Sequence, residues 1–246
     1  MKLQDKVALI TGGGGDLASA TAKLFLQEGA KVVLTVSKEE KVSSTRARYD
    51  ADQSVEVVKA DVRILEDMEN AAAFAVQTFG RLDILVTCAG AIRHGQIDEM
   101  TMDDWNQIVD VNLTGTFCAC KAVVPIMKRQ HYGKIVNVSS IAGRTGRPGN
   151  GVNYAASKAG VDGITRLLAT QLAKYNITVN GIAPGPMRGK MFDSMPPERQ
   201  ALSNSNVPLG RIGELDEVAY GILYMSSDDS SWTTGAILDI NGGLFT

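Results

Sequence analysis

Short apolar runs rich in β-branched residues alternate along this chain with longer stretches in which apolar residues recur every three or four positions. The short runs are 6–11, 31–36, 54–60, 82–90, 134–140, 177–184 and 236–242, and the longer stretches include 17–28, 66–79, 103–130 and 154–175. Short apolar runs are typical of buried strands, and the wider spacing is typical of amphipathic helices. The alternation predicts an α/β fold, a doubly wound parallel sheet of about seven strands with helices on both faces.

The length of 246 residues suits one large core and is short for two. We therefore expect a single domain over residues 1–246. Its least regular stretch, 184–211, is rich in proline and is expected to form a lid or loop over the site rather than a linker between domains.

Charge and composition argue against several classes of function. The formal net charge is −2 and there is no long basic stretch, so a nucleic-acid partner is not expected. No run of about 18 consecutive apolar residues occurs, and the charged segment 1–13 lacks the apolar core of a secretory signal. Cys88, Cys118 and Cys120 lack the paired spacing of a zinc or redox motif, which favours free buried thiols and no metal site. We expect a cytoplasmic protein with no membrane partner.

A glycine-rich turn follows the first predicted strand. Gly13, Gly15 and Ala18 satisfy G-x-G-x-x-A between a strand and a helix, which is the context of the dinucleotide-binding (Rossmann) fingerprint. Glycine allows the backbone to approach a pyrophosphate, whose charge then meets free N–H groups at the helix N-terminus. The alternative is a loop that only needs positive φ angles.

The end of the second strand bears on the choice of cofactor. NAD-binding sheets usually carry an acidic residue there, about 20 residues after the glycine turn, to bind the adenosine ribose. This chain has Val36 and Ser37 at that place, followed by Lys38. Ser37 and Lys38 would suit the 2′-phosphate of NADP(H), which is therefore favoured. NAD(H) stays possible if Lys38 is a solvated surface residue.

Tyr154 and Lys158 lie four residues apart, on one face of a predicted helix. The run N-V-S-S ends a strand shortly before them, and Asn112 lies inside an apolar helical stretch without a capping role. With the glycine turn, Asp61–Val62, Ala89–Gly90, N-G-I-A-P-G at 180–185 and the terminal G-A-I-L-D-I-N-G-G, these motifs resemble the short-chain dehydrogenase/reductase family over essentially the whole chain.

The resemblance implies NAD(P)-linked oxidation of an alcohol or reduction of a ketone by an Asn-Ser-Tyr-Lys tetrad. On this chain the tetrad is Asn112, Ser140, Tyr154 and Lys158. Tyr154 would be the general acid or base, and the Lys158 ammonium would lower its pKa and hold the nicotinamide ribose. Ser140 would bind the substrate oxygen, and Asn112 would hold a water that links Lys158 to solvent.

The serine is assigned by the family's S-x-x-G pattern, which matches Ser140 with Gly143 and favours Ser140 over the adjacent Ser139. Two departures from the family concern the cofactor site. Gly189 stands where many members have a threonine that bonds the carboxamide, and Cys88 replaces a frequent asparagine. The cofactor-binding residues that we expect are Gly12, Gly14, Gly15, Asp16, Leu17, Ser37, Lys38, Asp61, Val62, Ala89, Gly90, Tyr154, Lys158, Pro184, Gly185 and Met187.

Asp16 is a further departure, because it and Ala18 occupy the second and third glycine positions of the family's T-G-x-x-x-G-x-G turn. A carboxylate facing the pyrophosphate would repel it, whereas aspartate is a favoured residue at a helix N-cap. We expect Asp16 to cap its helix with the carboxylate turned away from the phosphates.

Substrate and assembly depend on loops and surfaces. The sequence does not separate a 3-oxoacyl-carrier-protein reductase from a polyol or sugar-acid dehydrogenase, and a non-catalytic nucleotide-binding regulator on the same fold is the alternative outside the enzyme class. Helices 103–130 and 154–175 are apolar on more than one face, and the family usually pairs them in a homotetramer.

Several cations in the loops suggest an anionic or strongly polar substrate group, unless they are solvated surface charges. They are Arg93, Arg144, Arg147, Arg188 and Lys190.

Overall fold

The computed structural model describes residues 1–49, 52–146, 150–193, 197–198, 200 and 205–246. Seven parallel strands form one sheet in the order β3-β2-β1-β4-β5-β6-β7. The strands are β1 Val7–Thr11, β2 Lys31–Val36, β3 Val55–Lys59, β4 Ile84–Thr87, β5 Gly133–Val138, β6 Ile177–Pro184 and β7 Ile237–Ile240. The predicted doubly wound parallel sheet is confirmed.

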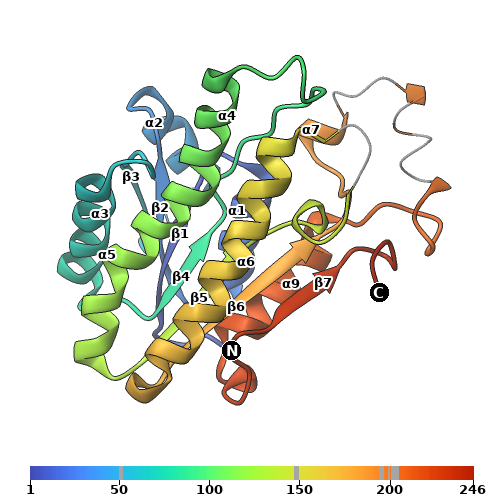
Figure 1. The fold of residues 1–246 in the computed structure, drawn as a ribbon. Helices are drawn as coiled ribbons and strands as arrows, with labels where there is room; N and C mark the ends of the chain where they lie inside the picture. Colours follow the sequence, from blue (N-terminus) through green and yellow to red (C-terminus); the bar gives the residue numbers. More distant parts are fainter. Residues whose placement is uncertain (50–51, 147–149, 194–196, 199, 201–204) are drawn as a thin grey trace.

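Helices cover both faces of this sheet (Figure 1). They are α1 Asp16–Gln27, α2 Glu40–Arg46, α3 Leu65–Phe79, α4 Met102–Val109, α5 Gly115–Gln130, α6 Val152–Leu172, α7 Lys190–Asp193 and α9 Leu215–Ser226. Alternate residues of β1 face opposite cores: Ala8 and Ile10 pack in the core under α1 and α9, and Leu9 packs in the core under α3, α5 and α6. Side chains of a strand alternate between faces, so burial on both faces explains why the strands read as continuous apolar runs.

The strand order reverses at β1, whose neighbours are β2 and β4. The two chain segments that leave β1 and β4 are pressed together there, because a Cβ on Gly12 would lie 2.7 Å from the Cα of Ala89. Gly12 also has φ +72°, a conformation that favours glycine. A topological switch of this kind opens a crevice at the carboxyl ends of the strands.

The stretch 103–130, predicted as one helix, is divided. A π-helical turn, Asp110–Thr114, joins α4 to α5. Among the described residues, Met102–Gln130 is also the one helix long and apolar enough to span a membrane by length and composition. Half of its apolar segment is buried within the molecule, as is typical of a core helix.

Two predicted strands are shorter than the apolar runs suggested. The run 82–90 contains β4 only at Ile84–Thr87, and the run 236–242 contains β7 only at Ile237–Ile240. After β4 the residues Cys88 and Ala89 continue the apolar pattern outside the strand, whereas β7 is followed directly by Asn241 and Gly242. The chain leaves the sheet after Thr87 because the following residues line the crevice instead of pairing with a neighbouring strand.

Candidate active site

A cavity of about 330 Å³ lies at the carboxyl ends of the central strands. The glycine turn, the loop after β4, the end of β5, the start of α6 and the segment after β6 contribute its walls. The predicted site residues that line it are Gly15, Asp16, Leu17, Gly90, Ser140, Tyr154, Lys158, Pro184, Gly185 and Met187. Those that do not line it are Gly12, Gly14, Ser37, Lys38, Asp61, Val62, Ala89 and Asn112.

Lys158 is buried in the wall of this cavity, one helical turn after Tyr154. Its Nζ donates a hydrogen bond of 2.8 Å to the carbonyl oxygen of Val138 at the end of β5. Burial lowers the pKa of Lys158 to about 8, against the opposing effects of Cys88 and Asp162. The amine therefore stays mostly protonated at neutral pH, although burial makes the proton easier to remove.

Tyr154 differs from the expectation in one respect. Burial raises the pKa of its phenol, and the hydrogen bond with Ser140 is what opposes this rise. Lys158 Nζ lies 5.9 Å from the centroid of the Tyr154 ring. In the chain alone, the Ser140 hydroxyl opposes the rise in the pKa of the phenol, and the ammonium of Lys158 is turned toward the Val138 carbonyl.

The two adjacent serines have separate partners. Ser139 Oγ donates to the carbonyl oxygen of Lys158 at 3.2 Å, and Ser140 contacts Tyr154. Ser140 Oγ also accepts the N–H of Ala142 at 3.1 Å, which fixes its rotamer at the start of a short 3₁₀ turn, Ile141–Gly143. A Cβ on Gly143 would lie 2.7 Å from the backbone of α6, so this turn needs glycine to pack there.

Asn112 lies in the π-helical turn and is fully buried. Its Nδ2 donates to the carbonyl oxygen of Ala91 at 2.9 Å and to Ser157 Oγ at 3.0 Å, and its Oδ1 accepts the Ala91 N–H at 2.8 Å. The side chain thereby joins the loop after β4 to α6. π-Helical turns inside α-helices are frequent at functional sites.

Asn153 is a residue of the site that the sequence analysis missed. Its Oδ1 accepts the N–H of Tyr154 at 2.7 Å, and its Nδ2 donates to the Asp104 carbonyl oxygen at 2.9 Å. The side chain is fully buried and ties the first turn of α6 to α4. An asparagine at a helix start directly before Tyr154 was the available signal.

The glycine turn reaches the cavity at Gly15, and its backbone is held by internal hydrogen bonds. Gly13 donates to the Thr35 carbonyl oxygen at 2.8 Å, and Gly15 donates to that of Gly12 at 2.9 Å. Of the four glycines, only Gly12 has a positive φ, and a Cβ on Gly14 would meet nothing within 4 Å. A positive φ therefore explains the glycine at position 12 only. Neither φ nor packing within the chain requires glycine at position 14, which is compatible with the close approach of a ligand.

Asp16 does not cap its helix, contrary to the expectation. Gly15 is the N-cap, with φ −81° and ψ 159°, and no side chain caps this terminus. Gly15 supplies the extended backbone of the cap, so Asp16 is already the first helical residue. Its Oδ2 accepts the N–H of Lys190 at 2.8 Å, and Gly189 lies beside it with φ +146°.

Four residues predicted to bind the cofactor lie away from the cavity: Ser37, Lys38, Asp61 and Val62. Asp61 binds Arg63 with a shortest N···O distance of 2.6 Å, and this contact lowers the pKa of Asp61. Val62 is buried against Gly115 of α5. Ser37 and Lys38 are exposed after β2, and the Lys38 amine lies 3.8 Å from Glu40.

The loop cations do not form a free positive surface. Arg147 lies outside the described residues. The other four have carboxylate partners: Arg93 with Asp104 at 3.0 Å, Arg144 with Asp239 at 3.5 Å, Arg188 with Glu214 at 3.0 Å and Lys190 with Asp16 at 3.8 Å. The hypothesis of an anionic substrate group loses its support from these four residues, because their charges are already compensated.

All three cysteines are free. Burial raises the pKa of Cys88 to about 12, although Lys158 acts in the opposite direction. A thiol with this pKa is protonated at neutral pH and is a poor nucleophile. Cys88 therefore contributes a small apolar surface to the cavity.

The family model described as enoyl-(acyl carrier protein) reductase matches residues 15–245. The chain is 41% identical over 245 residues to the 3-oxoacyl-[acyl-carrier-protein] reductase FabG of Thermotoga maritima, covering 99% of each chain. It is 37% identical to the (2S)-[(R)-hydroxy(phenyl)methyl]succinyl-CoA dehydrogenase subunit BbsD of Thauera aromatica, over 99% of this chain and 98% of that one.

Two further likenesses are to a diol dehydrogenase and to a solved structure. The 2,5-dichloro-2,5-cyclohexadiene-1,4-diol dehydrogenase LinX of Sphingobium indicum is 36% identical, over 98% of this chain and 97% of that one. The crystal structure of gox2181 superposes with a TM-score of 0.94 at 31% identity, covering 99% of this chain and 96% of that one.

Proposed function

The chain belongs to the short-chain dehydrogenase/reductase family and is an oxidoreductase, and on this premise we propose that it is an NADP(H)-dependent carbonyl reductase with the tetrad Asn112, Ser140, Tyr154 and Lys158. One observation carries the proposal. Ser140, Tyr154 and Lys158 line the same cavity as Gly15 of the glycine turn. A proton donor and a nucleotide cradle that share one cavity suit a reaction in which a proton and a hydride are added to one carbonyl group.

The residues at the switch point fit a nicotinamide nucleotide. Gly14 is open toward solvent where a pyrophosphate would approach, and Gly12 is pressed too closely on Ala89 for any larger residue. The backbone N–H groups at the start of α1 would hold the pyrophosphate. Lys158 and the segment Pro184–Met187 would hold the nicotinamide end. When bound, the nucleotide supplies or accepts the hydride.

The chain's own residues would handle the proton. Tyr154 donates its phenolic proton to the carbonyl oxygen during reduction and accepts it during oxidation. Ser140 holds the same oxygen and steadies its developing charge. The Ser140 hydroxyl already acts on the Tyr154 phenol before substrate arrives, since it opposes the rise in the pKa of that phenol. Lys158 keeps a positive charge beside the phenol, which favours the phenolate after proton transfer.

The walls of the cavity favour a ketone with an apolar flank. Ile92, Met187, Phe192 and Leu215 add apolar surface to the polar group around Tyr154. A polyol or sugar acid would leave several hydroxyl groups without partners against this surface, which costs free energy. We therefore propose a 3-oxoacyl thioester as the substrate class, in keeping with the activities for which FabG and BbsD are named. Polyol or sugar-acid oxidation is the competing substrate class.

The test is nucleotide-linked turnover of a substrate panel. Reduction of a 3-oxoacyl thioester with NADPH is compared with oxidation of polyols and sugar acids with NADP⁺ and NAD⁺. Tyr154→Phe is expected to lower kcat by at least 100-fold while NADPH affinity stays within threefold. Nucleotide binding without turnover of any substrate would instead identify a non-catalytic nucleotide-binding regulator.

The cofactor preference rests on the end of β2. Ser37 and Lys38 are exposed there, and neither Val36 nor Ser37 is acidic. An acidic side chain at this strand end would bind the 2′-hydroxyl of the adenosine ribose in NAD(H) and repel a 2′-phosphate. A neutral or basic side chain at the same place tolerates the 2′-phosphate of NADP(H). NADP(H) is thus the proposed cofactor, with NAD(H) as the alternative.

We further propose that residues 1–246 act as one nucleotide-binding domain with 184–211 as its substrate lid. Pro186, Met187, Arg188, Gly189 and Phe192 of this segment line the cavity. Met187 also bridges to Gly213, which holds the start of the segment against the body of the fold. The residues 194–196, 199 and 201–204 of the proposed lid lie outside the described residues.

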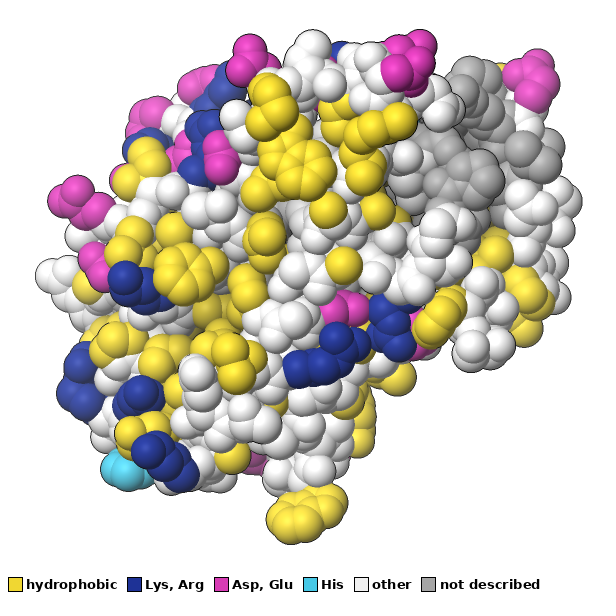
Figure 2. Space-filling view, in the orientation of Figure 1, with side chains coloured by type: hydrophobic (Ala, Val, Ile, Leu, Met, Phe, Trp, Pro, Cys, Tyr) yellow, Lys and Arg dark blue, Asp and Glu magenta, His cyan; other side chains and the backbone are white. Residues whose placement is uncertain are grey.

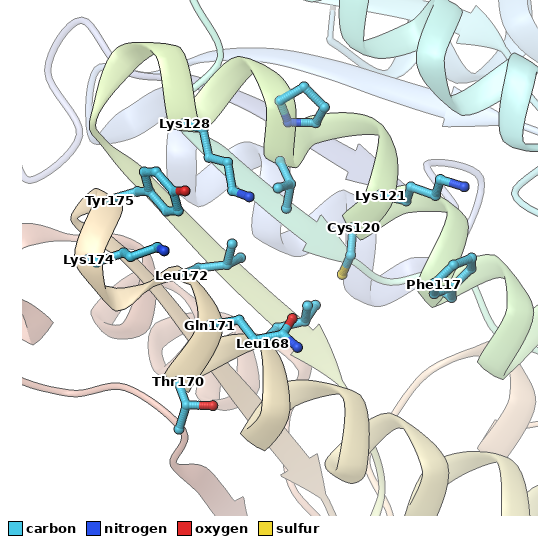
Figure 3. A pocket seen from close by; sticks show the side chains of 12 residues that line it. Phe117, Cys120, Lys121, Lys128, Leu168, Thr170, Gln171, Leu172, Lys174 and Tyr175 are labelled. Atoms are coloured by element: carbon cyan, nitrogen blue, oxygen red, sulfur yellow. The ribbon is translucent and has the colours of Figure 1, made fainter.

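A homotetramer is the proposed assembly. A groove of about 670 Å³ runs between α5 and α6, lined by apolar side chains with lysines at its margin (Figure 3). Apolar side chains also gather on the surface over α5 (Figure 2). Phe117 is 51% exposed and Leu167 is 60% exposed, and a second copy would cover such a surface. Light scattering should give the tetramer mass, and Leu167→Glu should lower it.

The cytoplasm is the proposed location. All three thiols are free, and free thiols persist in the reducing cytosol. Fractionation of the producing cell would place the activity with the soluble cytosolic proteins.

A further inference from the structure

Arg48 reaches the glycine turn from a distant part of the sequence. It lies in a short 3₁₀ turn, Ala47–Tyr49, that follows α2. Its guanidinium Nη1 donates a hydrogen bond of 3.2 Å to the carbonyl oxygen of Gly14, 34 residues earlier. No motif in the sequence marked this residue, because nothing between Gly14 and Arg48 predicts that the two meet.

The neighbours of Arg48 hold this turn in place. Tyr49 is buried, and its hydroxyl lies 3.4 Å from Ser19 Oγ in the first part of α1. Arg46 Nη2 donates to the carbonyl oxygen of Asp52 before β3. The backbone at Arg48 is thus fixed between α1 and β3, while its side chain stays exposed beside the glycine turn.

The glycine turn that Arg48 contacts lies beside the carboxyl end of β2. Gly13 donates to the carbonyl oxygen of Thr35, which joins the glycine turn to this strand end. In dinucleotide-binding sheets the adenosine ribose lies here, and a nearby arginine accommodates the 2′-phosphate of NADP(H). The glycine turn itself carries no basic residue, so a cation must come from elsewhere in the fold.

The charges around this end favour Arg48 over Lys38 as that cation. The Lys38 amine lies 3.8 Å from Glu40, which offsets its charge. Within the described part of the chain, no carboxylate lies within ion-pair distance of Arg48, and its hydrogen-bond partner is the neutral carbonyl of Gly14. A planar guanidinium also presents paired donors that match phosphate oxygens better than an ammonium does.

We propose that Arg48 binds the 2′-phosphate of NADP(H) and determines the preference for NADP(H) over NAD(H). The inference rests on the proposed function, since it requires the nucleotide at the glycine turn. Arg48 would exchange its contact with the Gly14 carbonyl for the phosphate, or share its five N–H groups between the two. Ser37 and Lys38 then lie in the outer part of the same subsite.

Isothermal titration calorimetry of the full chain with NADP⁺, NAD⁺, 2′-AMP and 5′-AMP tests this assignment without relying on turnover. Arg48→Gln is expected to raise the Kd of NADP⁺ and of 2′-AMP at least tenfold. The Kd of NAD⁺ and of 5′-AMP should change less than twofold. Arg129→Gln removes an exposed arginine from the last turn of α5 and is the matched control, with all four affinities unchanged. Lys38→Gln should raise the Kd of NADP⁺ less than threefold.

The failures of the two proposals differ. If the wild type prefers NADP⁺ and Arg48→Gln keeps that preference, the Arg48 assignment is overturned and the proposed function stands. If the wild type binds NAD⁺ as tightly as NADP⁺, the proposal of a 2′-phosphate subsite is overturned. The proposal that the protein is a nicotinamide-dependent oxidoreductase then still stands. If neither dinucleotide binds, the proposed function itself is overturned.

Discussion

The carboxylate of Asp16 accepts a 2.8 Å hydrogen bond from the backbone N–H of Lys190, 174 residues further along the chain. This bond joins the first residue of α1, beside the glycine turn, to the segment that follows β6. A Cβ at Gly189 would lie 3.2 Å from the same carboxylate oxygen, and its φ of +146° strains other residues. The two departures from the family's motifs, Asp16 and Gly189, are therefore neighbours in the fold.

Removing this carboxylate should loosen the segment after β6. Asp16→Ala is expected to raise the amide exchange rate of Lys190 about tenfold, because a hydrogen bond to a charged acceptor contributes roughly 1.5 kcal/mol. Hydrogen exchange resolved to residue 190 measures the effect. Asp193→Ala, which removes an exposed carboxylate from α7, is the control. Equal exchange in Asp16→Ala and the wild type would contradict a role for this bond in holding the segment.

Nucleotide affinity of an Asp16 variant tests the charge separately. The Asp16 carboxylate faces Lys190, whose amine lies 3.8 Å away, so its charge is partly offset. Asp16→Gly is expected to change the Kd of NADP⁺ less than tenfold, or about 1.4 kcal/mol. Tighter binding beyond that limit, measured by calorimetry, would show that the carboxylate opposes the pyrophosphate.

The buried amine of Lys158 should make stability depend on pH. Its pKa is about 8 in the folded chain against 10.5 in the unfolded one, so between these values the unfolded state binds more protons. Stability must therefore rise with pH in this window, by at most about 3 kcal/mol in total. Urea unfolding of the wild type and Lys158→Met between pH 7 and 9.5 should show a growing difference in favour of the wild type. A constant difference would place the folded pKa near its ordinary value.

Asn153 is expected to be a positioning residue for Tyr154. Asn153→Ala leaves the Tyr154 N–H and the Asp104 carbonyl without this partner, at a cost of about 2 kcal/mol in the free energy of unfolding. We expect kcat to fall at least fivefold while the Kd of NADPH is unchanged, since the first turn of α6 is then less well held.

Thr101→Ala is the matched control for Asn153→Ala. It removes the capping box of α4, in which Thr101 Oγ1 accepts the Asp104 N–H at 3.1 Å, and should cost about 1 kcal/mol of stability. Its kcat should stay at the wild-type value. An equal loss of kcat in both variants would show that the effect of Asn153→Ala comes from general destabilisation of α4 and not from the position of Tyr154.

The glycine turn offers a pair of substitutions with opposite effects. Gly12→Ala should destabilise the fold by more than about 1 kcal/mol, because its φ of +72° and the Ala89 backbone at 2.7 Å leave no place for a methyl group. Gly14→Ala should keep or slightly raise stability, since a Cβ there meets nothing within 4 Å. Its methyl group would instead lie where the proposed pyrophosphate approaches the glycine turn, and we expect it to weaken the binding of NADP⁺ severalfold. Thermal melts and calorimetry separate the two effects.

Local sequence patterns were sufficient to predict the secondary structure, the sheet and part of the candidate site. Apolar runs and helical spacing predicted the parallel sheet and its helices, because burial on both faces of a strand leaves a direct trace in the sequence. Tyr154 and Lys158 were paired by a spacing of four on one helix, which is a local relationship. The glycine turn was likewise recognisable, because its strand, turn and helix are consecutive.

Tertiary structure alone decided which distant groups meet. The contacts of Arg48 with Gly14 and of Asp16 with Lys190 join segments that no periodicity relates. It also decided that the four described loop cations have carboxylate partners and that Ser140 opposes the rise in the Tyr154 pKa. Hydrogen bonds and charge interactions act over a few ångströms in space, whereas a sequence pattern records only which face of an element is buried.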